Sequence, residues 1–378
     1  MSIFTGNHRQ AWAEAFIAGI PYAVASGMTL VETGPGHASL LLPARSTWTG
    51  DAERRLIHPG CLSVLADTAC GVAVGCALEE LEPFATLDLR MDYLPPPVAE
   101  TDLICRAECH RLSRSVAFVR GELTQPGQSE PVATVYATFM RATAATRRKD
   151  LPGAAAGQPR AEVPRPTPAQ AASSLIAPAS IETSQVFTSV AADLPETLAV
   201  PPGRSPYVDF LNVHQQPQID AGPVFRMPYK PELIGNPVLP ALHGGILAGF
   251  GETAMILHLL ATNPGLTGIP RSVDFAIAYM RSAKPIDTFA QSTTVRQCNR
   301  VALVMVSLWQ DDPQRSGVVA VVQEAQASSR GIRKWPRACT TGRCGSSCHS
   351  DTITSATRLP WRTVVLCAKV SMGLAERM

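Results

Sequence analysis

Residues 58–81 read HPGCLSVLADTACGVAVGCALEEL, and this stretch decides the fold. Between Cys61 and Leu78, Asp67 is the only ionisable residue apart from the cysteines, and small or apolar residues occupy every helical face. A helix that is apolar all round is buried by surrounding structure. The stretch therefore predicts a central helix, about 30 Å long at a rise of 1.5 Å per residue, with the rest of a domain wrapped around it.

Asp67 stands alone on this apolar helix. Removing an isolated carboxylate from water has a large free-energy cost, and carboxylates in such settings are frequent at functional sites. One interpretation is a general base or nucleophile at a buried acyl site. The other is a solvated side chain beside a groove.

The same pattern returns 185 positions later (243 − 58), where His243-Gly244-Gly245 opens a second apolar stretch. Glu252 stands there in the place of Asp67. The matches at this offset, or at 186 in the strand that follows, are Pro21-Tyr22 with Pro206-Tyr207, Pro43 with Pro228, Gly50 with Gly235, Thr68-Ala69 with Thr253-Ala254, Leu87-Asp88 with Val273-Asp274, and Tyr93 with Tyr279. Such self-similarity indicates an internal duplication and two domains.

Composition limits the classes of function. The chain has 378 residues and a formal net charge of +2, so neither nucleic acid nor a membrane is an expected partner. The N-terminus lacks the basic-then-apolar layout of a signal peptide. Six cysteines lie in apolar patterns, as reduced core thiols do, and we expect a cytoplasmic protein; they are Cys61, Cys70, Cys76, Cys105, Cys109 and Cys298.

Alternating segments flank each apolar helix and predict antiparallel strands. Residues 10–20 predict a short leading helix, which is shorter in the second copy. Two strands are expected in residues 28–43. The strands expected after the helices are 86–94, 102–110, 116–124 and 131–141 in the first copy, and 272–280, 288–297, 301–309 and 317–326 in the second. One helix followed by long strands implies a curved sheet around that helix.

Two segments break the pattern. Residues 143–204 are rich in Ala and Pro and predict a disordered linker between domains at 10–142 and 205–326. Residues 327–378 predict a disordered tail. The tail contains Cys339, Cys344, Cys348 and His349, but their spacing fits no zinc site, so we expect no metal and no cofactor.

The motifs resemble those of hotdog-fold acyl-CoA thioesterases of the PaaI-like family. The residues that carry the resemblance are His58-Pro59-Gly60 with Asp67, His243-Gly244-Gly245 with Glu252, and the strands that begin at Thr86 and Ser272. The resemblance covers both repeats but neither linker nor tail. It implies an α+β fold of two tandem hotdog domains, each a curved antiparallel sheet around a long central helix. The two would form a pseudo-dimer within one chain, and a homodimer of such chains is a further option.

The resemblance implies hydrolysis of acyl-CoA thioesters to the free acid and CoA. Such chemistry needs a carboxylate and donors for the developing oxyanion. Backbone N–H groups at a helix start are such donors, and glycine there permits close approach. A non-catalytic acyl-CoA-binding or regulatory module is the alternative, and a hydratase or dehydratase with His58 or His243 as base is a third reading.

In this family each active site lies at the interface between two hotdog units. The family's site residues therefore correspond to two sets of residues in this sequence. The first set joins Asp67 and Thr86 with Asn236, His243 and Gly244; the second joins Asp51, His58 and Pro59 with Glu252 and Ser272. Residues expected to contact substrate are Gly60, Gly245, Arg114, Arg281, Lys284 and Arg300. The four basic residues border strands where the coenzyme's phosphates would lie.

The two sets are not equivalent. Pro59 has no backbone N–H and cannot donate to an oxyanion, whereas Gly244 can. Asp51 takes the place of Asn236 and would add an acceptor or a negative charge. We therefore expect the Asp67 site to carry the activity and the Glu252 site to be degenerate.

Cys61 is a further candidate nucleophile because it lies near a helix start. Its counterpart in the second copy is Ile246, and no base is evident beside it. Sequence therefore gives this thiol little support as a nucleophile.

Overall fold

The computed structural model describes residues 6–80, 82–141, 205–216, 222–236, 240–266, 268–298, 301–311 and 318–327. The expected linker at 143–204 and the tail from 328 onward lie outside these residues. So does Arg300, one of the basic residues expected to contact the coenzyme.

The first repeat contains one long helix, two shorter ones and a set of antiparallel strands. Its elements are α1 (Gly6–Ala18), α2 (Pro21–Ser26), β1 (Thr29–Gly34), β2 (His37–Leu42), a 3-10 turn (Ser46–Trp48), β3 (Thr49–Asp51), β4 (Leu56–Ile57), α3 (Pro59–Ala77), β5 (Phe84–Tyr93), β6 (Leu103–Leu112), β7 (Val116–Thr124) and β8 (Ala133–Arg141). The leading helix predicted at 10–20, with its end near Gly19 and Pro21, corresponds to α1, which ends at Ala18, and a second helix, α2, that the sequence analysis does not predict begins at Pro21. Pro21 begins α2 at a position where proline costs no hydrogen bond, and Gly27 ends it in the left-handed conformation.

The second repeat follows the same order. Its described elements are α6 (Pro206–Leu211), β9 (His214–Gln215), β10 (Val224–Met227), a 3-10 turn (Pro231–Leu233), β11 (Ile234–Asn236), β12 (Ala241–Leu242), α7 (Gly244–Thr262), β13 (Arg271–Tyr279), β14 (Thr288–Gln297), β15 (Val301–Trp309) and β16 (Val318–Ala327). At the 185-residue offset, α6 matches α2 and not α1. The counterpart of α1 would fall outside the described residues.

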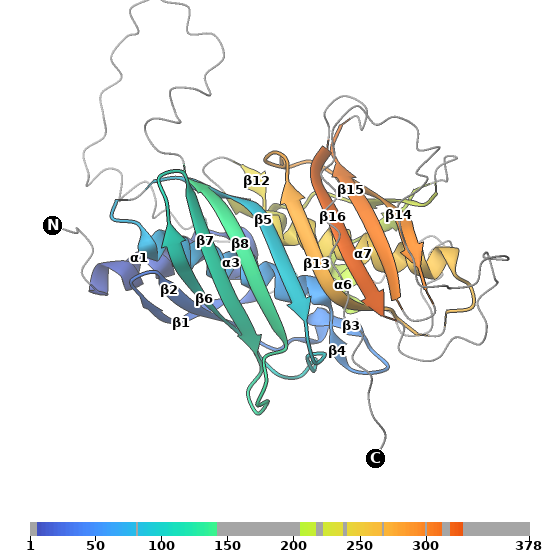
Figure 1. Ribbon diagram of the computed structural model, residues 1–378, viewed down its shortest axis with the longest axis horizontal. Helices are drawn as coiled ribbons and strands as arrows, with labels where there is room; N and C mark the ends of the chain where they lie inside the picture. The colour runs from blue at the N-terminus through green and yellow to red at the C-terminus, as the bar shows by residue number, and fades with distance from the viewer. Residues whose placement is uncertain are drawn as a thin grey trace, which may run out of the picture. The chain divides into compact units, whose positions relative to one another are not determined.

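Twelve of the described strands form one antiparallel sheet, in the order β1-β2-β6-β7-β8-β5-β13-β16-β15-β14-β10-β9, while β3 pairs with β4 and β11 with β12 in two separate two-stranded sheets. The repeats join where β5 pairs with β13, with Leu89 opposite Ile277. Figure 1 shows these two strands side by side at the centre of the sheet, with α3 and α7 packed behind it. Residues far apart in sequence therefore meet at this junction.

The two 19-residue central helices form the core. Both are long and apolar enough to cross a membrane, but 94% and 83% of their most apolar windows are buried inside the protein. Strands supply the surrounding wall, with side chains that alternate between buried and exposed along β8. Asp67 and Glu252 both lie within this core.

The central helices touch through their backbones. A Cβ added to Gly60 would lie 2.7 Å from the Cα of Gly249, and one added to Gly245 would lie 2.4 Å from the Cα of Val64. Only glycine permits such contact without displacement of the neighbouring helix. Since Gly60 and Gly245 are counterparts, each repeat places the start of its helix beside the second turn of the other repeat's helix.

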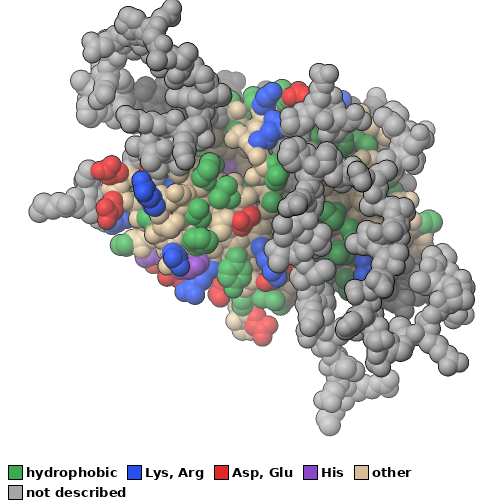
Figure 2. Space-filling model, turned by 45° about the horizontal axis from the view of Figure 1, so that its top comes forward, with side chains coloured by type: hydrophobic (Ala, Val, Ile, Leu, Met, Phe, Trp, Pro, Cys, Tyr) green, Lys and Arg blue, Asp and Glu red, His purple; other side chains and the backbone are tan. Residues whose placement is uncertain are grey.

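The cysteines agree only in part with the prediction of core thiols. Cys61, Cys70, Cys76 and Cys105 are buried free thiols, but Cys109 is half-buried and Cys298 is exposed, so these last two are not core residues. Figure 2 shows basic and acidic side chains interspersed over the face in view. Some exposed charges on the described part of the chain are paired, as in the 2.9 Å contact between Arg120 and Glu108.

Candidate active site

The Asp67 carboxylate lies where the two repeats meet. Its Oδ1 accepts a 2.9 Å hydrogen bond from Thr86 on β5, and its Oδ2 accepts one of 2.8 Å from the Gly245 N–H at the start of α7. A β-bulge follows Thr86 in its pairing with β8, and bulges redirect side chains at such positions. The carboxylate is thus held by one donor from each repeat.

His243 caps α7 and is held in one tautomer. Thr68 donates its only hydroxyl proton to the Val64 carbonyl at 2.8 Å, so the 3.1 Å contact between Thr68 Oγ1 and His243 Nε2 requires the proton on Nε2. Nδ1 then accepts from the Gly245 N–H at 3.0 Å. Both ring nitrogens are occupied.

Nδ1 of His243 also lies 3.3 Å from Asp67 Oδ2. Burial lowers the pKa of His243, against the opposing effect of Asp67. The ring is therefore neutral, and this contact is two acceptors sharing the Gly245 N–H rather than an ion pair.

Gly244 lies against the carboxylate. A Cβ added there would be 2.8 Å from Asp67 Oδ2 and 3.3 Å from the Tyr279 hydroxyl. Tyr279 donates a 2.8 Å hydrogen bond to the Gly244 carbonyl. Among the described residues nothing accepts from the Gly244 N–H, the first amide of α7. The site thus combines a carboxylate with a free helix-start N–H, where the helix dipole favours negative charge.

Glu252 occupies the equivalent place on α7 but in different surroundings. Its Oε2 accepts from Ser63 on α3 at 3.1 Å, and its Oε1 accepts from the Tyr93 hydroxyl on β5. It is 0% exposed, against 6% for Asp67. Burial raises the pKa of Glu252 to about 8, so this acid is largely protonated at neutral pH.

His58 repeats the role of His243 at the start of α3. Its Nδ1 accepts from the Gly60 N–H at 3.0 Å, and its Nε2 lies 3.5 Å from Thr253 Oγ1. The ring stacks on Tyr207 with centroids 4.4 Å apart. Burial lowers the pKa of His58 to about 3, which keeps this cap uncharged.

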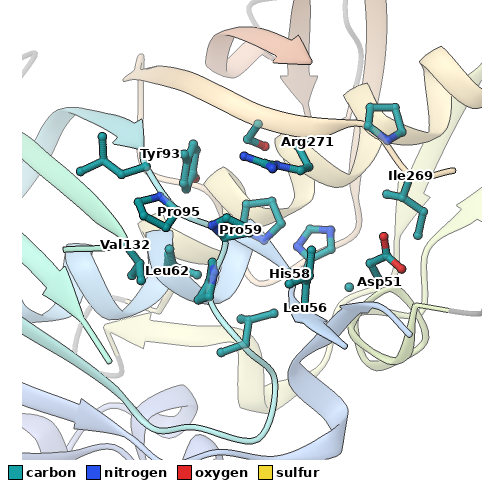
Figure 3. Close-up of a pocket in the computed structure, with 17 residues that line it drawn as sticks. Asp51, Leu56, His58, Pro59, Leu62, Tyr93, Pro95, Val132, Ile269 and Arg271 are labelled. Carbon is teal, nitrogen blue, oxygen red and sulfur yellow. The ribbon is translucent and has the colours of Figure 1, made fainter. Parts of the chain in front are cut away.

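A pocket opens at the Pro59 end of the molecule, not beside Asp67. Figure 3 shows Asp51, Pro59, Tyr93 and Arg271 around it, with Arg271 directed toward Tyr93. Ser272 also lines it, whereas Glu252 does not. The pocket therefore lies over the second set of predicted residues, with the acid of that set behind Tyr93.

The structure brings together most of the first predicted set. Asp67, Thr86, His243, Gly244 and Gly245 form one cluster. Asn236 ends the short strand β11, where its side chain is exposed. The predicted residues of the second site lie around the start of α3: Asp51, His58, Pro59 and Ser272 line one pocket there, Gly60 follows Pro59, and Glu252 bonds to Ser63 and Tyr93.

The basic residues expected at the coenzyme lie on two different turns. Arg114 is exposed between β6 and β7 of the first repeat, and Arg281 is half-buried just after β13 of the second. Lys284 is exposed and forms a 3.4 Å ion pair with Asp311. Their role toward phosphates remains a prediction.

Three site residues were not expected from sequence: Ser63 and Tyr93, which donate to Glu252, and Tyr279, which donates to the Gly244 carbonyl. A signal for Ser63 exists, because its counterpart at the 185-residue offset is Ala248, so only the Glu252 site has this hydroxyl. Tyr93 and Tyr279 are matched residues that bond to different groups.

Cys61 is fully buried, and burial raises its pKa well above the ordinary value. Such a thiol is a core residue rather than a nucleophile. No group of three His, Cys, Asp or Glu residues able to hold a metal occurs among the described residues.

An antiparallel sheet packed against a buried central helix is the hotdog arrangement, and the described strands pack against the buried helices α3 and α7 in this way. Residues 55–132, within the first repeat, match the family model of the thioesterase superfamily. No curated protein matches the chain significantly.

Solved structures resemble one repeat or both. A protein from Pseudomonas aeruginosa is 32% identical over 35% of this chain and 98% of its own, with a TM-score of 0.33. A mutant of the phenylacetic acid degradation protein PaaI from Thermus thermophilus is 29% identical over 32% and 98%, with a TM-score of 0.27. A candidate thioesterase from Novosphingobium aromaticivorans is 14% identical over 79% and 97%, with a TM-score of 0.50. This last likeness concerns the fold alone and extends over both repeats.

Proposed function

We propose that this chain hydrolyses acyl-CoA thioesters to the free acid and CoA, and that the Asp67 site performs the reaction. The observation that carries the proposal is the position of the Asp67 carboxylate at the start of α7, against Gly244. A carboxylate and an N–H group without an acceptor, both at one helix start, are the two groups that thioester hydrolysis requires.

In the proposed reaction, the thioester carbonyl oxygen accepts a hydrogen bond from the Gly244 N–H. The Asp67 carboxylate either removes a proton from an attacking water or attacks the carbonyl carbon itself. Negative charge develops on the carbonyl oxygen and is stabilised by the N–H and the dipole of α7. Collapse of the intermediate breaks the C–S bond, and the thiolate takes up a proton. If water attacked, the free acid forms in this step; if Asp67 attacked, water then hydrolyses the anhydride between the acyl group and Asp67, which releases the acid and restores the carboxylate. In both routes water has been added across the C–S bond. Thr86 and the Gly245 N–H hold the carboxylate in place.

The Glu252 site is proposed to be degenerate. Pro59 has no N–H to offer an oxyanion, and the loss of one such donor typically costs about 10²–10³ in rate. Glu252 is also fully buried, with both oxygens bonded to Ser63 and Tyr93. Its raised pKa, about 8, opposes a role as a base at neutral pH.

The two alternative functions would require other features of the site. A hydratase or dehydratase would need His58 or His243 as a base, but each ring is a helix cap whose Nδ1 already accepts an N–H. A non-catalytic acyl-CoA-binding module would need no reactive carboxylate. The tandem PaaI-like pseudo-dimer belongs to the same proposal, supported by the sequence motifs and the pairing of β5 with β13.

The test is thiol release from acyl-CoA substrates of increasing chain length, with acyl carrier protein thioesters as a second series. Wild type should release free thiol, Asp67→Asn should abolish the release, and Glu252→Gln should retain most of it. Circular dichroism and thermal melting would show whether each variant is folded. The reverse ranking of the two variants would refute the assignment, and a wild type that binds acyl-CoA without releasing thiol would favour the binding module.

A further inference from the structure

The pocket beside Pro59 has features that hydrolysis at Asp67 does not use. Most of its wall is apolar, and includes Leu56, Leu62, Leu94, Pro95, Val132 and Ile269. A few polar groups at one part of such a wall are the usual composition of a small-molecule site. The question is which chemical group those polar side chains select.

Ser272 provides the first indication. It lines the pocket, is 8% exposed, and its buried hydroxyl has no hydrogen-bond partner among the described residues. Its counterpart Thr86 donates to Asp67. A buried hydroxyl without a partner costs free energy, and a ligand oxygen in the pocket would satisfy it.

Charge provides the second indication. Arg271 lines the pocket, and its counterpart 186 positions earlier is Ala85, so this cation belongs to the Pro59 end alone. The acidic residue in the lining, Asp51, is already paired with Arg54 at 3.2 Å. His58, also in the lining, is neutral. The charge of Arg271 therefore remains to attract an anion.

Because of the position of Glu252, the pocket could bind a ligand without catalysing a reaction on it. Tyr93 forms part of the pocket wall, and its hydroxyl bonds to Glu252, which lies behind. Ser63 holds the other carboxyl oxygen. A ligand in the pocket thus meets Tyr93, Ser272 and Arg271 but no reactive carboxylate.

We infer that this pocket binds a monocarboxylate with an apolar tail and does not transform it. Arg271 pairs with the carboxylate, Ser272 donates a hydrogen bond to it, and the Leu, Ile, Val and Pro side chains enclose the tail. Because the proposed function releases a free acid at Asp67, the ligand belongs to the same chemical class as the product; this identification rests on that function. The pocket beside Pro59 is then a carboxylate-binding site at the position that corresponds to the proposed catalytic site at Asp67.

The experiment is isothermal titration calorimetry of the full-length protein with octanoate and with octanamide, a neutral ligand of the same length. Octanoate should bind at least about tenfold more tightly, because only the carboxylate can pair with Arg271. Arg271→Ala should weaken octanoate binding at least about tenfold, and Ser272→Ala should weaken it by less. Arg271→Lys should restore part of the affinity, since it keeps the charge but not the planar guanidinium.

Arg90→Ala is the matched control, because Arg90 is an exposed arginine on β5 that pairs with Asp92 at 3.1 Å. It should leave octanoate binding unchanged. Equal affinity for octanoate and octanamide, or octanoate binding that survives both Arg271→Ala and Ser272→Ala, would overturn the inference. So would the absence of octanoate binding to the wild type.

This outcome is independent of the thiol-release test. If thiol is released but octanoate binding does not depend on Arg271, the proposed carboxylate-binding pocket is refuted and the proposed hydrolysis stands. If Arg271-dependent binding occurs without any thiol release, the site stands as a ligand site and the proposed function fails.

Discussion

The backbone N–H of Gly245 donates to the carboxylate of Asp67 over 2.8 Å, although the two residues are 178 positions apart. The same N–H also donates to Nδ1 of His243, its own helix cap, at 3.0 Å. The carboxylate of one repeat therefore completes the helix start of the other. Four predictions follow from this arrangement and from its counterpart at Glu252.

Thr86→Val should lower kcat/KM by about 10–100-fold, because it removes a hydrogen bond to a carboxylate that is expected to be worth about 1.5–3 kcal/mol. Val keeps the shape of Thr but leaves Asp67 Oδ1 without the Thr86 donor, so a loss of about 1–3 kcal/mol of stability is also expected, and thermal melting must show that the variant is folded. Thr86→Ser keeps the hydroxyl and should retain most activity. The measurement is thiol-release kinetics, and a Thr86→Val enzyme as active as wild type would show that this hydrogen bond does not position the carboxylate.

His243→Asn should retain most activity and most helix stability, because asparagine is a good helix cap. His243→Ala should cost about 1 kcal/mol of stability through the lost cap, together with part of the activity. Asparagine cannot serve as a base, so the variant separates a capping role from a chemical one. A loss of activity in folded His243→Asn as large as that of Asp67→Asn would assign His243 to the chemistry.

Glu252 should make the protein less stable as pH rises. Its pKa is raised from 4.5 to about 8 in the fold, so the folded state holds a proton that the unfolded state releases between these values. This contribution is fully present below about pH 4.5 and is lost as pH rises toward 8. At about 1.4 kcal/mol per pKa unit, the change is on the order of a few kcal/mol.

Glu252→Gln should remove that pH dependence, since glutamine does not titrate. Chemical denaturation of both proteins across this pH window gives the difference, in which the contributions of other groups such as His58 cancel. Parallel stability curves for wild type and variant would contradict the assignment.

Gly60→Ala should destabilise the fold by about 1–3 kcal/mol or more, as overpacking does, because the new Cβ would lie 2.7 Å from the Cα of Gly249. Gly71→Ala is the matched change on the same helix. Its Cβ would meet nothing closer than Phe84 at 3.7 Å, so a gain of about 0.5–1 kcal/mol in free energy of unfolding is expected. Equal effects of the two substitutions in urea denaturation would mean that the helices do not touch at Gly60.

Much of the fold could be predicted because buried helices and strands have characteristic patterns of apolar residues in the sequence. Residues 58–81 are apolar on all sides, and the structure places a buried helix at Pro59–Ala77. Alternation located β7 at its observed bounds, Val116–Thr124. The end of the leading helix near Gly19 and Pro21 could be predicted as well, whereas α2, a six-residue helix at Pro21–Ser26, could not, because so short a segment shows no clear helical period.

Which residues lie together around Asp67 could be predicted, but the hydrogen bonds of the two acids could not. The offset between Asp67 and Glu252 identifies both acids, and Pro59 against Gly244 identifies their difference. That Glu252 bonds to Ser63 and Tyr93 depends on the extra methylene of Glu and on where α3 crosses α7. Such contacts are set by packing between repeats, which no local pattern records.

The pairing of β5 with β13 has a consequence for how this protein could change over time. In a homodimer of single domains, one gene specifies both sites, so every substitution appears twice and the sites stay identical. Here each repeat has its own codons, while each site draws on both repeats. A proline at position 59 can therefore arise without a proline at position 244. In the same way, Ser63 can bond to Glu252 while its counterpart near Asp67 is an alanine, Ala248. Joining the units in one chain releases the two sites from symmetry and lets one keep its chemistry while the other acquires a different task.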